Sequence, residues 1–201
     1  HTYEYGTDEH MALLEVIGAE GQALICVGYP DALENSADPN SCIISSINSN
    51  LSQMVKRAMA WVAYTNGDPA DTTLIGVDDH GFDWQTVGYW AQQRVNNGHP
   101  EPYRVKYWEI GNEQYGKWEI GHTSPENYAE KFKDYYRAMK AVDPSIRIII
   151  NGYRESEWYS PLLATIGDEF DIYSWHSPNG IDEPADDEDI YLAMMATSMG
   201  T

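Results

Sequence analysis

Long apolar runs are missing from this 201-residue sequence, and so are the usual marks of secretion. No run reaches the roughly 18 apolar residues that suggest a membrane-spanning helix, so we expect no membrane partner. The chain opens with His1-Thr2-Tyr3-Glu4 instead of a basic and then apolar signal peptide, and it has no initiator methionine. We therefore expect a mature, processed or truncated product.

Basic residues are scarce. The sequence holds 12 Lys and Arg against 32 Asp and Glu, which gives a formal net charge of -20. Phosphate backbones and anionic lipid head groups repel such a surface, which argues against nucleic acid and membrane surfaces as partners. A neutral substrate suits this charge better.

Cysteine and paired histidine are nearly absent. Cys26 lies in an apolar run and Cys42 in a polar loop, so they can form a disulfide only if that loop folds back over the end of the strand. Neither cysteine belongs to a Cys-x-x-Cys or Cys/His pattern, and the six histidines include no His-x-x-x-His pair. We predict no metal site and no other cofactor.

Phenylalanine is rare, whereas other aromatic residues are plentiful. Three Phe stand against seven Trp and 15 Tyr. Trp and Tyr combine a flat apolar ring with a polar edge, which suits stacking on sugars, although the same residues also fill cores and interfaces.

Helical and extended patterns alternate along most of the chain. The length allows a substantial core but falls short of the roughly 250 residues of a complete (β/α)8 barrel. Alternation of this kind is typical of repeated βα units around a parallel sheet. The expected helices span residues 7–18, 51–64, 84–95, 124–142 and 155–166, and the expected strands span 23–27, 105–110, 146–150 and 170–175. Residues 29–50 are expected to form a long loop, and residues 190–196 a further helix.

Gly111-Asn112-Glu113 follows directly on the expected strand 105–110. Barrel enzymes present their catalytic side chains at this end of a strand. Glu113 could protonate a glycosidic oxygen if apolar neighbours and a second carboxylate raise its pKa, and Asn112 could hold a sugar hydroxyl. On these three residues alone, the alternative is that Glu113 is an exposed loop glutamate and Asn112 a turn residue.

The apolar surroundings that Glu113 needs could come from Tyr107, Trp108 and Tyr115, which lie close to it in the sequence. Aromatic rings lower the local dielectric and thereby disfavour the carboxylate form.

The segment Val105–Glu113, VKYWEIGNE, closely resembles the acid/base segment of α-L-arabinofuranosidases of glycoside hydrolase family 51. Further matches occur in the family's order. They are Gly6–Glu9, Ile17–Glu20, Trp61–Gly67, Asn97–Tyr103, Trp118–His122 and Ala141–Ser145.

The resemblance implies an α/β fold, a (β/α)8 TIM barrel whose fourth strand ends in the acid/base glutamate, here Glu113, preceded by a substrate-binding asparagine, here Asn112. Residues 1–201 would form one partial catalytic domain covering about strands three to six. His176 would end strand six and enter the active-site cleft, either contacting substrate or only supporting other side chains.

Two departures limit what the resemblance implies. The family usually has asparagine where this sequence has Gly28, and tyrosine where it has Pro178. The family's nucleophilic glutamate, at the end of strand seven, is not found. The candidates for this role fall in expected helices or loops instead of at the end of a seventh strand. They are Glu155, Glu157, Glu169 and Glu183.

We therefore expect a retaining glycoside hydrolase that releases α-L-arabinofuranosyl residues from arabinose-containing polysaccharides or oligosaccharides. The alternatives are another barrel glycosidase of the same clan, such as a xylosidase, glucanase or glucuronidase, and a non-catalytic half-barrel that binds carbohydrate or serves a structural role. We expect the chain alone to be inactive, and to associate with the remaining barrel segments or with itself.

Overall fold

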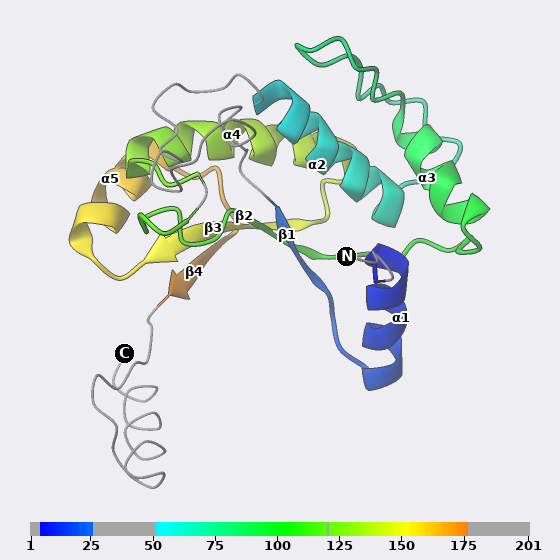
Figure 1. Ribbon diagram of the computed structural model, residues 1–201, viewed down its shortest axis with the longest axis horizontal. Coiled ribbons are helices and arrows are strands. Elements are labelled where there is room, and N and C mark those ends of the chain that lie inside the picture. The colour runs from blue at the N-terminus through cyan, green and yellow to red at the C-terminus, as the bar shows by residue number, and fades with distance from the viewer. Residues whose placement is uncertain (1–4, 26–50, 120, 177–201) are drawn as a thin grey trace, which may run out of the picture.

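The computed structural model describes residues 5–25, 51–119 and 121–176, and its centre is a four-stranded sheet (Figure 1). The strands are β1 (Gln22–Ile25), β2 (Tyr107–Ile110), β3 (Arg147–Tyr153) and β4 (Ile172–His176). All neighbours are parallel, and the strand order β1-β2-β3-β4 follows the sequence. At least one helix lies in each connection, so the fold is a partial (β/α)8 barrel, as predicted.

In the described part of the chain, five helices accompany the sheet. They are α1 (Thr7–Ile17), α2 (Leu51–Asn66), α3 (Val87–Asn96), α4 (Pro125–Val142) and α5 (Ser156–Ile166). Helices α2, α4 and α5 form an arc over one face of the sheet, and α3 lies outside α2 (Figure 1). Within the described residues no helix covers the opposite face, which is the inner face of a barrel.

Helix α4 shows how local sequence sets these elements. Ser124 Oγ accepts a hydrogen bond from the backbone N–H of Asn127, and Pro125 occupies the first turn, where its missing N–H costs nothing. The helix stops at Val142, before Asp143-Pro144. Its apolar stripe is fully buried and consists of Tyr128, Ala129, Phe132, Tyr135 and Met139.

The core lies between the sheet and this arc of helices. Trp108 and Ile110 of β2 and Ile148 and Ile150 of β3 are 0% exposed and pack in the same cluster as the α4 stripe. Side chains alternate across a strand, so the residues between them face the barrel interior. The interior face therefore carries Glu109.

The expected helices and strands that fall in the described residues are all present, with shifted ends. Helix α3 begins at Val87 instead of residue 84, because residues 74–86 form antiparallel bridges between Leu74 and Thr86 and between Val77 and Asp83. Strand β3 runs on to Tyr153, three residues beyond the expected end.

Several predictions fall outside the described residues. They concern the pairing of Cys26 with Cys42, the loop 29–50, the departures at Gly28 and Pro178, Glu183 and the helix 190–196. In the described part of the chain, every helix is too short or too polar to cross a membrane.

Candidate active site

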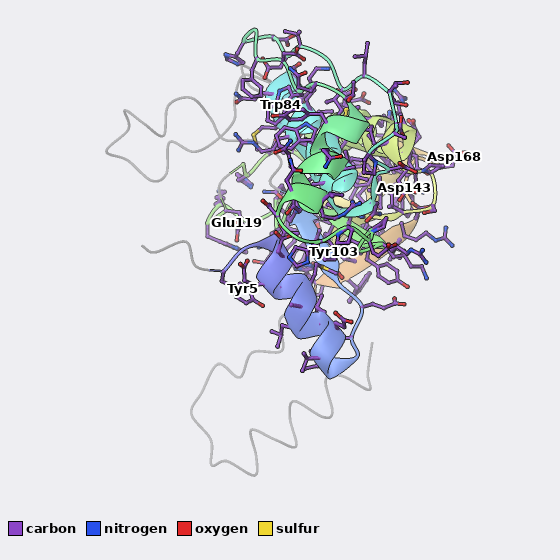
Figure 2. All side chains as sticks on the ribbon, turned by 90° about the vertical axis from the view of Figure 1, so that its right-hand side faces the viewer. Tyr5, Trp84, Tyr103, Glu119, Asp143 and Asp168 are labelled. Carbon is purple, nitrogen blue, oxygen red and sulfur yellow. The ribbon has the colours of Figure 1, made fainter. Side chains whose placement is uncertain are left out.

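The predicted site residues follow the carboxyl ends of strands. Because the strands are parallel, these ends meet at one edge of the sheet. Glu113 follows β2 and His176 closes β4, and His176 Nδ1 lies 3.3 Å from Glu113 Oε1. Glu119, in the loop after β2, lies on the opposite side of the molecule from Asp143 and Asp168, whose loops lead into β3 and β4 (Figure 2). The structure thus brings Glu113 and His176 together at the edge where barrels carry active sites.

The backbone around Glu113 is tightly constrained. Gly111 has φ 82°, and Glu113 has φ 51°, a left-handed conformation that is uncommon for a residue other than glycine. The buried side chain of Gln114 accepts from Asn112 N at 2.6 Å, and Gln114 N donates to Asn151 Oδ1 at 3.2 Å. These bonds tie the strained turn to β3.

Three side chains hold the carboxylate of Glu113. Trp118 Nε1 donates to Oε2 at 2.9 Å, His176 faces Oε1, and the hydroxyl of Tyr115 makes a further hydrogen bond. Donation from Trp118 is the largest influence and lowers the pKa of Glu113; partial burial acts in the opposite direction, and His176 and Tyr115 lower it further. The expected raised pKa is therefore not found in the described residues, among which no second carboxylate contacts Glu113.

The predicted aromatic surroundings are right for Tyr115 and wrong for Trp108 and Tyr107. Trp108 points to the helix side, where it packs edge-on against Trp61 of α2 at 5.5 Å between ring centroids. Tyr107 lies at the other end of β2 from Glu113. Adjacent strand residues point to opposite faces, so closeness in sequence does not place a side chain beside Glu113.

Tyr115 belongs to a group of rings beside Glu113. It stacks on Tyr153 at 4.0 Å with an interplanar angle of 13°, and it meets Trp158 and His176 edge-on. Trp118 completes the group and is 71% exposed. Stacked and exposed rings next to a carboxylate are suited to a sugar.

Asn112 lies beside Glu113 in the turn, but its side chain turns to another partner. Its Nδ2 donates to Glu119 Oε1 at 3.1 Å. The amide is thus oriented by a carboxylate of the same loop.

Below this edge lies a buried polar group that the sequence reasoning missed. The carboxylate of Glu109 bonds to Gln22 Nε2 and Ser174 Oγ, both at 2.7 Å, and to Asn151 Nδ2 at 3.4 Å. A glutamate between the apolar residues Trp108 and Ile110 of the expected strand 105–110 was the available signal. Asn151, at the end of the run 146–150, was a second one.

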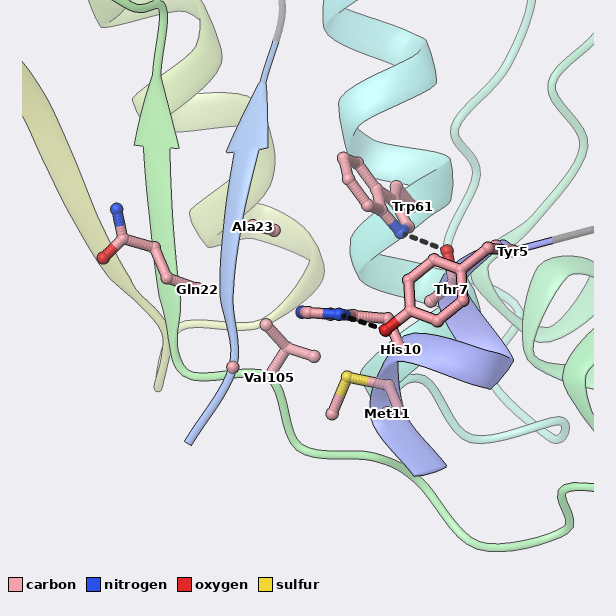
Figure 3. Close-up of a pocket in the computed structure, with 10 residues that line it drawn as sticks. Tyr5, Thr7, His10, Met11, Gln22, Ala23, Trp61 and Val105 are labelled. Carbon is pink, nitrogen blue, oxygen red and sulfur yellow. Dashed lines mark hydrogen bonds between the residues drawn. The ribbon is translucent and has the colours of Figure 1, made fainter. Parts of the chain in front are cut away.

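Cavities also lie away from this edge of the sheet. One of about 430 Å³ lies between α1, α2 and the edge of β1, and Tyr5, His10, Met11, Gln22 and Trp61 are among its lining residues (Figure 3). Within it Tyr5 Oη and His10 Nδ1 are 3.1 Å apart. In the described ranges no group of three or more His, Cys, Asp or Glu side chains is placed to hold a metal ion.

A family model described as alpha-L-arabinofuranosidase 1 domain matches residues 1–191. Among similar proteins, alpha-L-arabinofuranosidase C of Emericella nidulans is 32% identical over 188 residues, which cover 87% of this chain and 29% of that protein. Intracellular exo-alpha-(1->5)-L-arabinofuranosidase 1 of Bacillus subtilis is 33% identical over 98 residues, covering 46% of this chain and 20% of that protein.

Solved structures of alpha-L-arabinofuranosidases are also similar to this chain. An alpha-L-arabinofuranosidase from Thermotoga maritima, in an arabinose complex, superposes with a TM-score of 0.64 at 32% identity over 91% of this chain and 30% of that one. A thermostable family 51 enzyme from Thermotoga petrophila gives 0.62 at 31% identity over 88% and 28%. The chain therefore spans less than a third of the length of each of these proteins.

Proposed function

Because the chain belongs to the alpha-L-arabinofuranosidase 1 domain family, we propose that it forms the central part of the catalytic barrel of a retaining arabinofuranosidase. The proposed substrate is an arabinose-containing polysaccharide or oligosaccharide, the substrate class that the names of the relatives indicate. Residues 1–201 count as one partial catalytic domain, which the remaining barrel segments complete.

Glu113 is the proposed general acid/base. In the first step, a carboxylate from another barrel segment bonds to the anomeric carbon, the glycosidic bond breaks, and Glu113 gives its proton to the leaving oxygen. In the second step, Glu113 removes a proton from water, the water oxygen attacks the same carbon, and arabinose leaves with release of the nucleophile. No cofactor takes part in this scheme.

The observation that carries the proposal is that hydrogen-bond donors contact both carboxylate oxygens of Glu113. The backbone of Glu113 has a left-handed conformation, and Trp118 and His176 each contact one oxygen of its carboxylate. These donors favour the ionised form, which is the form required in the second step. For the first step, a like-charged nucleophile nearby would raise the pKa of Glu113 and supply the protonated form.

Asn112 and His176 are the proposed substrate-binding residues. The Asn112 amide, oriented by Glu119, can hold a sugar hydroxyl close to the reacting carbon. His176 Nδ1 lies 3.3 Å from Glu113 Oε1. A substrate that contacts His176 must therefore lie next to Glu113.

The test is Glu113→Gln in the complete protein that carries this sequence. Glutamine keeps the shape but cannot transfer the proton, so turnover of arabino-oligosaccharides should fall by about 10² to 10⁴. Activated aryl arabinofuranosides need little protonation, so their first step should be largely spared. Azide, a nucleophile that needs no general base, should then accelerate turnover of the variant.

Glu126→Gln, which removes one exposed carboxylate from α4, is the matched control and should behave as the parent. Equal activity of Glu113→Gln and the parent on an oligosaccharide would remove Glu113 from this role. A panel of aryl arabinofuranosides, xylosides, glucosides and glucuronides distinguishes the proposed substrate from those of other clan members, and binding without turnover by the parent would indicate the non-catalytic alternative.

A further inference from the structure

Glu109 lies on the inner face of the sheet and is only 6% exposed. Burying a carboxylate is costly unless it is fully hydrogen-bonded. Each of the other three strands supplies one donor: Gln22 from β1 to Oε2, and Asn151 from β3 and Ser174 from β4 to Oε1. The carboxylate thus ties the four strands together directly below the candidate active site.

The imidazole of His176 bridges this buried carboxylate and the candidate acid/base. Its Nε2 lies 3.6 Å from Glu109 Oε1, and its Nδ1 lies 3.3 Å from Glu113 Oε1. An imidazole ring can donate from both nitrogens only when it is protonated. In the neutral ring, Nε2 would instead accept from Asn151 Nδ2, which lies 3.4 Å away.

The ring of His176 lies between two carboxylates, with Glu113 at Nδ1 and Glu109 at Nε2. Among the described residues, the titratable groups that face Glu109 are His176 and, from α4, the phenol of Tyr128; those that face His176 are Glu109, Glu113 and Tyr115. In the described ranges no lysine or arginine is in contact with either side chain.

We propose that Glu109 is a positioning residue that keeps His176 protonated and oriented, so that Nδ1–H points at the carboxylate of Glu113. The inference deepens the proposed function and rests on it for its kinetic consequence. Glu109 itself is too deeply enclosed to touch substrate. It acts through His176, which holds Oε1 of Glu113 while Trp118 holds Oε2.

The experiment uses the complete protein with ¹⁵N-labelled histidine. In the parent at neutral pH, the His176 ring should show two protonated nitrogens in long-range ¹H–¹⁵N spectra. In Glu109→Gln, which keeps the shape and removes the charge, the ring should show one protonated nitrogen. The alkaline limb of the kcat/KM profile, which follows loss of the protonated form of Glu113, should move to higher pH, because a neutral His176 stabilises the carboxylate of Glu113 less than a protonated one does.

Two further variants separate positioning from folding. Glu109→Asp retains the charge and should restore the doubly protonated ring, while Glu126→Gln should match the parent in spectrum and profile. A parent ring with only one protonated nitrogen overturns the proposal even if Glu109→Gln does not fold. An unchanged spectrum and profile in a folded Glu109→Gln overturn it as well.

The spectra also separate this inference from the proposed function. If the parent fails to hydrolyse arabinofuranosides but the ring of His176 loses a proton in Glu109→Gln, the substrate assignment is wrong and the role of Glu109 stands. If the parent is active and the ring does not change, the substrate assignment stands and the proposed role of Glu109 is wrong.

Discussion

Trp118 favours the ionised form of Glu113 although its ring is largely exposed. A hydrogen bond to the charged form of a carboxyl group lowers its pKa, and donation from Trp118 Nε1 is the largest such influence on Glu113. Trp118→Phe keeps a ring and removes the donor, so the pKa of Glu113 should rise relative to the parent. Titration of a ¹³C-labelled Glu113 carboxylate in the complete protein measures this change.

Gly116→Ala tests the same contact from the backbone. A Cβ atom at Gly116 would lie 2.3 Å from Trp118 Cε2, so the indole must move away from Glu113. The pKa should again rise, with little effect on unfolding because Trp118 is exposed. A pKa that stays at the parent value in both variants would show that Trp118 does not control the group.

The sequence predicted which residues meet at the site better than it predicted the pKa of Glu113. Glu113 and His176 follow the ends of parallel strands, so their meeting could be deduced from strand order alone. The direction of the Glu113 pKa could not, because it depends on the indole of Trp118 folding back over the turn. Glu109 and Asn151 escaped notice because a polar residue in an apolar strand acquires its partners only when neighbouring strands are in register.

The start of β4 is fastened to β3 and α4 through Asp171. Its Oδ2 accepts from Ile148 N at 2.8 Å and lies 2.9 Å from Lys140 Nζ, and its Oδ1 lies 3.2 Å from Arg147 Nη1. Burial acts to raise the pKa of Asp171, but the hydrogen bonds and nearby cations outweigh it, and the pKa lies below its ordinary value of 3.8.

Asp171→Asn should therefore destabilise the fold by about 1–3 kcal/mol near neutral pH, because these donors lose a charged acceptor. A depressed pKa contributes stability above the unfolded-state value, and this contribution is lost as the pH falls through the folded-state value. The gap between parent and variant in thermal unfolding should be full above about pH 5 and shrink below about pH 4. A gap that does not vary with pH would contradict the electrostatic origin.

Helices α2 and α3 depend on one fully buried cation. Arg94 is 0% exposed, and its guanidinium donates to the backbone carbonyls of Tyr64, Gly67, His99 and Pro100. Arg94→Lys replaces a planar fork by a single ammonium that cannot reach all four oxygens. We expect a loss of about 2–4 kcal/mol of stability.

The measurement is the unfolding midpoint of the complete protein, with Gln92→Ala on the exposed side of α3 as the matched control. That control should stay within about 0.5 kcal/mol of the parent. If Arg94→Lys behaves like the control, the four carbonyls find other donors and the cation is dispensable.

Periodicity predicted the elements well and their ends less well. The stripe of α4 and the apolar run of β3 were clear from spacing, since burial of one face dictates it. The predicted helix start at residue 84 was wrong. The indole of Trp84 instead donates a hydrogen bond to Asp78, within the bridged segment 74–86. Such a local polar contact leaves no periodic trace in the sequence.

The four-stranded sheet has two open edges in the described residues, at β1 and at β4. In a closed barrel, neighbouring strands would pair with both edges. On β4, Ile172 is 36% exposed and Trp175 is 54% exposed, although both are large apolar side chains. An unpaired, apolar strand edge is a template for pairing with another chain.

A polypeptide of residues 1–201 alone should therefore lack turnover and associate with itself. General acid catalysis by one carboxylate contributes only about 10² to 10⁴ in rate, and without a second carboxylate no glycosyl-enzyme forms. The net charge of -20 opposes association at low salt, so the oligomers should grow as ionic strength rises and screens this repulsion. Light scattering over a salt series, alongside an aryl arabinofuranoside assay with the complete protein as reference, measures both effects. Clear turnover by a monomer would mean that the nucleophile lies within these 201 residues and that this chain does not correspond to strands three to six of the barrel.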